Sequence, residues 1–239
     1  MRIFLTLDPS KDVYSQIELA KKLGFDGVEI VLEDYMREVV EKEKEKIKNK
    51  LENLGIYASF HLPNWLNILN RDDQKEILHL YRIVEYFNSF GVVHILSDDE
   101  DSIKKYKIVE KEIKDKNLYF ENLFQRAEIL ENIFTFNLKF VIDISHFLTV
   151  NSFSKFKEFL LKNKNKIFHF HLSDINGITH SHLPLGKGIL PIKKIVEILV
   201  EYFNDRTISF EIFETDIPEL DFEISIKIFK NIIDKYGKK

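Results

Sequence analysis

The sequence contains no cysteine among its 239 residues. This absence excludes disulfides, thiolate nucleophiles and zinc–thiolate sites, and it leaves nitrogen and oxygen as the ligand atoms for any metal. No apolar run approaches the roughly 20 residues of a membrane span. The first residues, MRIFLTLDPS, turn polar too soon for a signal peptide. We therefore expect a cytosolic (cytoplasmic) protein with no membrane partner.

The charge balance gives no general attraction to nucleic acid. The formal net charge is -4, which weighs mildly against a phosphate-backbone partner. The run EKEKEKIKNK at 41–50 spaces Glu and Lys so that they pair across a helical turn, as on a solvated helix face. A hydrophobic fraction of 44% and a charged fraction of 31% are ordinary for a globular protein. We predict a single domain over residues 1–239.

Short apolar or β-branched runs alternate eight times with longer amphipathic stretches. This alternation, with no G-x-G-x-x-G after the first run, favours an α/β fold of the (β/α)8 TIM-barrel type over an open doubly wound sheet. Gly24, Gly55 and Gly91 stand where they would end helices. The expected strands are 2–7, 27–32, 57–62, 92–96, 118–123, 138–143, 167–172 and 207–213.

Residue types that ligate metals gather at the ends of these predicted strands, where the active sites of such barrels lie. His169 and His171 alternate along one strand and so share a face, whereas His79 falls in a helical pattern. The candidates at or just after strand ends are His61, His94, Glu121, Asp143, His146, His169, His171 and Glu211.

Imidazoles and carboxylates from separate strands would converge on one or more divalent cations. Mixed ligands of this kind suit Zn, Mn, Fe or Co, and a site dominated by oxygen suits Mn or Mg. A single strand histidine such as His94 or His169 is more often a hydrogen-bonded core group. Glu121 and Glu211, by contrast, have apolar neighbours and would be costly to bury without an ion partner.

Seven segments together carry a resemblance to a known superfamily. In order and in strand position the chain resembles the xylose isomerase-like TIM-barrel superfamily, which includes sugar isomerases, sugar phosphate isomerases and epimerases, inosose dehydratases and AP endonucleases of the endonuclease IV type (AP endonuclease family 2). The segments are GFDGVEI (24–30), FHLPNWLNIL (60–69), FENL (120–123), VIDISHF (141–147), HLSD (171–174), HLPLGKGIL (182–190) and SFEIF (209–213).

In the isomerase and epimerase branches, the resemblance implies one divalent metal ion, Zn, Mn, Mg or Co. The metal ligands would be Glu121, Asp143, His171 and Glu211. Glu121 and Glu211 would also be the catalytic proton-transfer groups on opposite faces of the substrate. The implied activity is isomerisation or epimerisation of a small sugar, polyol or sugar phosphate.

The endonuclease IV branch is the alternative implied by the same resemblance. There a three-zinc cluster cleaves DNA at abasic sites, and its additional ligand positions are matched here by His61, His94, His146 and His182. His180 stands where that pattern has Asp, which leaves a third zinc less well compensated. The short chain and the negative net charge also weigh against a DNA partner.

Two further residues are candidates for substrate contacts. Trp65 would stack on a base or a sugar ring, or else pack at the rim of the barrel. Lys187, inside the G-x-G of PLGKGIL and ahead of a helix expected near Pro191, would contact a phosphate together with backbone amides, or else belong to a tight turn.

Overall fold

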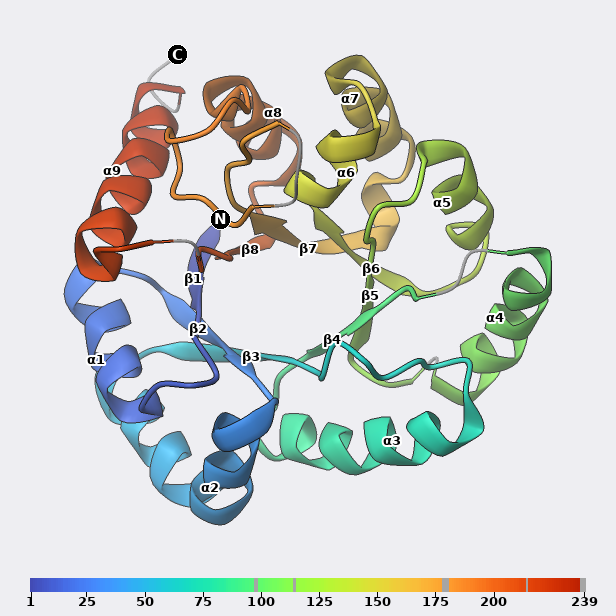
Figure 1. The fold of residues 1–239 in the computed structure, drawn as a ribbon, viewed down its shortest axis with the longest axis horizontal. Coiled ribbons are helices and arrows are strands. Elements are labelled where there is room, and N and C mark those ends of the chain that lie inside the picture. The colour runs from blue at the N-terminus through green and yellow to red at the C-terminus, as the bar shows by residue number, and fades with distance from the viewer. Residues whose placement is uncertain (97–98, 114, 178–180, 214, 237–239) are drawn as a thin grey trace.

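The computed structural model describes residues 1–96, 99–113, 115–177, 181–213 and 215–236. Within them, eight parallel strands close into a barrel in the order of the sequence (Figure 1). This confirms the predicted (β/α)8 TIM barrel. The strands are β1 (Arg2–Thr6), β2 (Gly27–Val31), β3 (Tyr57–His61), β4 (Gly91–His94), β5 (Leu118–Glu121), β6 (Lys139–Asp143), β7 (Ile167–Leu172) and β8 (Thr207–Phe210).

Helices surround the barrel, and two of them, α6 and α7, follow β6 (Figure 1). Among the described residues, no helix combines the length and the apolar character needed to span a membrane. The helices are α1 (Val13–Leu23), α2 (Asp34–Leu54), α3 (Arg71–Tyr86), α4 (Glu100–Ile113), α5 (Ala127–Ile133), α6 (Ile144–Val150), α7 (Phe153–Lys162), α8 (Ile192–Phe203) and α9 (Pro218–Tyr236), with a short 3-10 turn, η1 (Lys164–Lys166).

Helix ends follow local backbone chemistry. Gly24 (φ 82°) and Gly55 (φ 61°) are the left-handed C-caps of α1 and α2, as predicted. The prediction for Gly91 is wrong, because α3 ends at Tyr86 and Gly91 begins β4. A Cβ atom at position 91 would lie 2.9 Å from Cδ1 of Leu62. Glycine at this position therefore permits close packing at the base of the strand.

Several strands end earlier than the apolar runs suggested. β8 ends at Phe210, so Glu211 lies just beyond the strand and not within it. The amide of Glu211 still donates to the carbonyl of Leu172 at 3.2 Å, which keeps this residue against β7. This backbone hydrogen bond holds Glu211 beside β7 although β8 has already ended.

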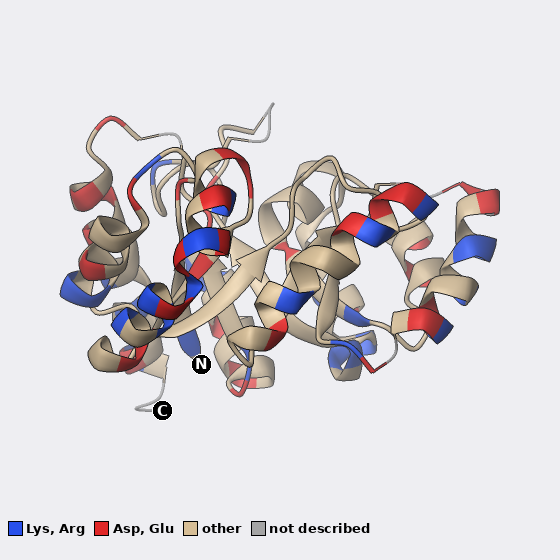
Figure 2. Ribbon diagram, turned by 90° about the horizontal axis from the view of Figure 1, so that it is seen from below, with Lys and Arg blue, Asp and Glu red and all other residues tan. Residues whose placement is uncertain are grey.

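The two faces of each strand have different surroundings. Along β7, Phe170 and Leu172 point toward the helices, while His169 and His171 point into the barrel, and all four are buried. Lys, Arg, Asp and Glu lie mainly on the surrounding helices (Figure 2). The run at 41–50 lies on α2, where Lys46 pairs with Glu43 at 3.5 Å, in agreement with the predicted solvated face.

Candidate metal centre and active site

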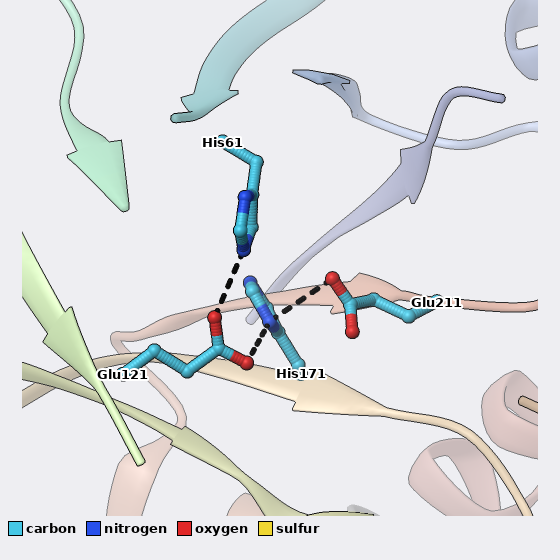
Figure 3. Close-up of side chains that lie close together, drawn as sticks. All are labelled: His61, Glu121, His171 and Glu211. Atoms are coloured by element: carbon cyan, nitrogen blue, oxygen red, sulfur yellow. Dashed lines mark hydrogen bonds and ion pairs between the residues drawn. The ribbon is translucent and has the colours of Figure 1, made fainter. Parts of the chain in front are cut away.

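Three of the four implied metal ligands meet at the carboxyl-terminal mouth of the barrel, together with His61. Figure 3 shows His61, Glu121, His171 and Glu211 pointing toward one another, and one ligand atom from each lies within 4.8 Å of the others. Nδ1 of His171 lies 2.8 Å from Oε1 of Glu121 and 3.2 Å from Oε1 of Glu211. Both carboxylates therefore approach the same imidazole nitrogen.

Barrel register explains why these side chains meet. His94 pairs with Glu121 between β4 and β5, and Asp143 pairs with His171 between β6 and β7. Because all strands are parallel, the carboxyl ends that carry these residues gather at the same mouth. Glu211 joins them at this mouth, directly after β8.

Asp143 lies beside this group. It is fully buried, and its Oδ1 caps helix α6 by accepting from the amide of His146. Its Oδ2 has no hydrogen-bond partner among the described residues. A buried carboxylate oxygen without a donor is unfavourable, and a cation at this point would satisfy it.

The protonation of the glutamates reflects this crowding. Burial and the nearby Glu121 and Asp143 carboxylates raise the pKa of Glu211 to about 8, although His171 opposes the shift. Burial disfavours the charged form of Glu121 as well, but His171 and two further imidazoles hold its pKa well below the usual range. Without a cation, the site thus contains one ionised and one protonated glutamate near neutral pH.

His61 is held between two acceptors. Its Nε2 donates to Oε2 of Glu121 at 3.0 Å, and its Nδ1 donates to the carbonyl of Leu62 at 2.8 Å. Burial disfavours the imidazolium, but the Glu121 carboxylate outweighs burial and raises the pKa of His61 to about 9. In the absence of a metal this histidine is therefore cationic at neutral pH.

The other predicted histidines surround the same group. Nε2 of His94 lies 3.3 Å from Oε2 of Glu121. Nδ1 of His146 donates to the carbonyl of Asn122 at 3.1 Å, and ligand atoms of His146, Asp143 and Glu121 lie within 4.8 Å of one another. Nδ1 of His182 donates to the carbonyl of Glu211 at 3.1 Å.

A cavity of about 350 Å³ opens onto these side chains at the mouth of the barrel. Its lining mixes polar and apolar groups, and no Lys or Arg lines it among the described residues. The lining residues are Val31, His61, Asn64, His94, Leu96, Leu123, His146, His182, Glu211 and Phe213.

A family model described as a xylose isomerase-like TIM barrel matches residues 17–232. The chain belongs to the xylose isomerase-like TIM-barrel family. An uncharacterized protein of Methanocaldococcus jannaschii is 34% identical over 84 residues, which are 35% of this chain and 29% of that protein. The match thus spans less than a third of that relative's length.

Solved structures share the whole fold. A D-tagatose 3-epimerase-like protein is 21% identical, with a TM-score of 0.82 over 100% of this chain and 99% of the other. A D-psicose 3-epimerase, crystallised in the presence of D-fructose, is 16% identical, with a TM-score of 0.75 over 98% and 99% of the two chains. At these identities the likeness shows that this xylose isomerase-like chain shares their fold.

Trp65 and Lys187, two predicted substrate contacts of this xylose isomerase-like barrel, do not line the described cavity. Trp65 is 59% exposed and does not line the cavity in the described part of the chain. Nζ of Lys187 lies 2.6 Å from Oδ1 of Asp221. His79 is exposed on α3, as expected from its helical setting. His180 lies outside the described residues.

The G-x-G turn uses its backbone amides within the chain. The amides of Gly186 and Gly188 each donate to Oδ2 of Asp174 at 3.0 Å, and the amides of Ile175 and Leu190 donate to its Oδ1. A buried carboxylate thus occupies the position in this loop where an external anion would bind. A Cβ at Gly188 would collide with Asp174, and Gly186 has a φ of 85°, so both positions favour glycine.

Glu29 is the member of this site that the sequence interpretation did not select. It lies on β2, fully buried, with Oε1 at 3.0 Å from Nε2 of His171. Burial disfavours its charged form, but His171 and His169 hold its pKa well below the usual range. A carboxylate among apolar neighbours in GVEIV is the signal that selected Glu121, and it would have selected Glu29 as well.

Proposed function

We propose that the protein is a divalent-metal-dependent isomerase or epimerase acting on a small sugar, polyol or sugar phosphate by proton transfer. The observation that carries this proposal is the approach of Glu121 and Glu211 to one nitrogen of His171, at 2.8 Å and 3.2 Å. The orphaned Oδ2 belongs to Asp143, which offers a ligand atom within 4.8 Å of Glu121. The D-psicose 3-epimerase that shares this fold supports the same assignment.

Glu121, Asp143, His171 and Glu211 form what we term the four-residue cluster, the proposed ligands of one Zn, Mn, Mg or Co ion. Three carboxylates and one imidazole are donors that such ions accept. A bound cation supplies polarisation of a substrate carbonyl and its adjacent hydroxyl, which lowers the barrier to removing the proton between them.

The two glutamates handle the proton itself. A carboxylate on one face of the substrate removes a proton from carbon, and a carboxylic acid on the other face returns one, which inverts that centre. The contrast between Glu121, with a depressed pKa, and Glu211, with a pKa of about 8, supplies one group of each kind before ligands enter. Leu96, Leu123 and Phe213 give the cavity an apolar wall beside these groups.

Deuterium exchange tests this proposal. The chelator-stripped protein, reloaded separately with each metal, is incubated with a panel of ketoses in heavy water. We expect deuterium at the carbon next to the carbonyl and appearance of an epimer or aldose isomer. The Glu121→Gln and Glu211→Gln variants should each exchange at least about 100-fold more slowly, and His79→Gln on the surface should match the wild type.

Two results would refute it. One is the absence of exchange with any metal on any substrate of the panel. The other is wild-type exchange by the Glu121→Gln or Glu211→Gln variant.

A second candidate function rests on a separate observation. Nε2 of His61 and Nε2 of His94 lie 3.0 Å and 3.3 Å from the same oxygen, Oε2 of Glu121. This arrangement would extend the cluster to a further zinc, as in an AP-endonuclease-like phosphodiesterase acting on abasic DNA. The absence of Lys and Arg from the described cavity lining places this candidate second. Cleavage of an abasic duplex by the zinc-loaded protein, with no ketose exchange, would reverse the order.

A further inference from the structure

Glu29 lies below the four-residue cluster, on the side away from the cavity. Its Oε1 lies 3.0 Å from Nε2 of His171, and its Oε2 lies 3.4 Å from Nε2 of His169. The hydroxyl of Ser59 donates to Oε2 at 3.0 Å. Since Glu29 is completely buried, its charge is offset by the His171 imidazole and by the polar contacts from His169 and Ser59 within the barrel.

His171 therefore lies between two layers of carboxylate. Its Nδ1 faces Glu121 and Glu211 on the cavity side, and its Nε2 faces Glu29 on the inner side. Nε2 lies at hydrogen-bond distance from Glu29 without hydrogen-bond alignment, so the contact here is a close ion pair. A histidine binds a metal through the ring nitrogen that carries no proton. An acceptor beside the other ring nitrogen keeps the proton there and so determines which nitrogen can bind.

We propose that Glu29 is the positioning residue of His171. Its carboxylate keeps a proton on Nε2, so that Nδ1 is the atom offered to a cation together with Glu121 and Glu211. This rests on the proposed function only in assuming a cation at the four-residue cluster. On metal binding, the proton on Nδ1 leaves to solvent while the proton on Nε2 stays against Glu29.

His169 leaves Glu29 available for this role. Its Nδ1 contacts the hydroxyl of Thr207, and its Nε2 contacts the hydroxyl of Ser209 at 2.9 Å. Hydroxyls both donate and accept, so a neutral His169 is satisfied on both nitrogens. His171 has carboxylates on both sides instead, and it is the histidine whose ring Glu29 orients.

Zinc affinity of the full-length, chelator-stripped protein tests this assignment. Glu29→Gln keeps the shape of the side chain and removes its charge, and we expect it to bind zinc about 10- to 100-fold more weakly than the wild type. Ser59→Ala is the matched control, because it removes a buried contact of Glu29 without touching His171. It should weaken zinc binding less than about threefold. Equal affinity of Glu29→Gln and wild type, or equal losses in the two variants, would overturn the proposal.

A second measurement needs no variant of Glu29. Nitrogen-15 spectra of the histidine rings in the zinc-loaded wild type, with His171 identified by its loss in His171→Asn, should show a proton on Nε2 and coordination through Nδ1. The opposite assignment would contradict the proposal.

The two proposals fail in distinguishable ways. Zinc binding that depends on Glu29, without ketose exchange, removes the proposed function and retains the role of Glu29. If the protein catalyses ketose exchange but its zinc affinity does not depend on Glu29, the proposed function stands and the role of Glu29 is refuted. A wild-type protein that binds no zinc or other divalent cation overturns both.

Discussion

Asp143 and Asn122 are joined by two hydrogen bonds that link the ends of β6 and β5. The amide of Asp143 donates to Oδ1 of Asn122 at 2.9 Å, and Nδ2 of Asn122 donates to the carbonyl of Asp143 at 3.1 Å. With the α6 cap on its Oδ1, Asp143 is fixed in place while its Oδ2 stays without a donor. This carboxylate oxygen is preorganised for a group from outside the chain, either a cation or a hydrogen-bond donor.

Asp143→Asn tests whether that ligand is a cation. The amide keeps an acceptor for the helix cap but loses the charge, so we expect metal affinity to fall by about 100-fold or more with little change in unfolding temperature. Metal content after equilibrium dialysis measures the effect. Asp221→Asn changes another buried carboxylate, one paired with Lys187, and should retain full occupancy. Unchanged occupancy in Asp143→Asn would remove Asp143 from the ligand set.

The metal-free protein should lose stability as the pH rises from 6.5 to 9. The pKa of Glu211 is raised from 4.5 to about 8 in the folded protein. Between these two pH values the folded form binds a proton that the unfolded form has lost, so the stability that this group contributes falls as the pH rises toward 8. The pKa of His61 is raised to about 9, so its contribution is complete below 6.5 and lost as the pH passes 9. Glu29 and Glu121, with depressed pKa values, contribute fully throughout this window.

Thermal unfolding in the presence of a chelator measures this pH dependence. The wild type should unfold at a lower temperature at pH 9 than at pH 6.5. Glu211→Gln should show a flatter dependence, because its side chain does not titrate. A wild type that is equally stable or more stable at pH 9 would contradict the assignment of these shifts.

Gly188→Ala should destabilise the fold through the loop after β7. An added Cβ would collide with the carbonyl of Ile175 and with Oδ1 of Asp174, so we expect a loss of roughly 2 kcal/mol or more. Gly55→Ala is the control, since its φ of 61° is strained for alanine but no atom lies within 4 Å of the added Cβ. It should cost about 1 kcal/mol. Urea unfolding that ranks Gly188→Ala as the milder variant would disprove the close approach in this loop.

Phe213 and Trp65 should differ in their effect on substrate binding. Phe213 lines the cavity and contacts the ring of His182, with centroids 4.9 Å apart. Trp65 is exposed and outside the lining. We expect Phe213→Ala to raise KM about tenfold and Trp65→Ala to change it less than about twofold. The reverse order would return Trp65 to the substrate site.

The architecture was predictable because each strand and its following helix carry a local signal. Short apolar or β-branched runs identified the eight strands, and parallel strands necessarily end at one mouth. His61, Glu121, His171 and Glu211 could therefore be expected near one another before any distance was known. The final residue of each strand was less predictable, because Glu211 continues the backbone contact to β7 after β8 has ended.

Contacts made by barrel closure could not be predicted in the same way. Glu29 contacts His171 although 142 residues of sequence (171 minus 29) separate them, and only the closed barrel makes this pair. Gly91 is required by a side chain, Leu62, from the preceding strand's end. The amides of the G-x-G turn are paired with Asp174, a tertiary contact that the turn's own residues do not reveal.

Metal content per chain tests the central claim most directly. The protein is purified without chelator or added metal, and its metal content is measured by elemental mass spectrometry. Hydrogen–deuterium exchange at the carbon next to the carbonyl of a ketose is measured in heavy water on the same sample. We predict about one divalent ion per chain, lost with Asp143→Asn and required for exchange. Three zinc ions per chain without exchange, or exchange that persists after complete removal of metal, would contradict a metal-dependent isomerase or epimerase.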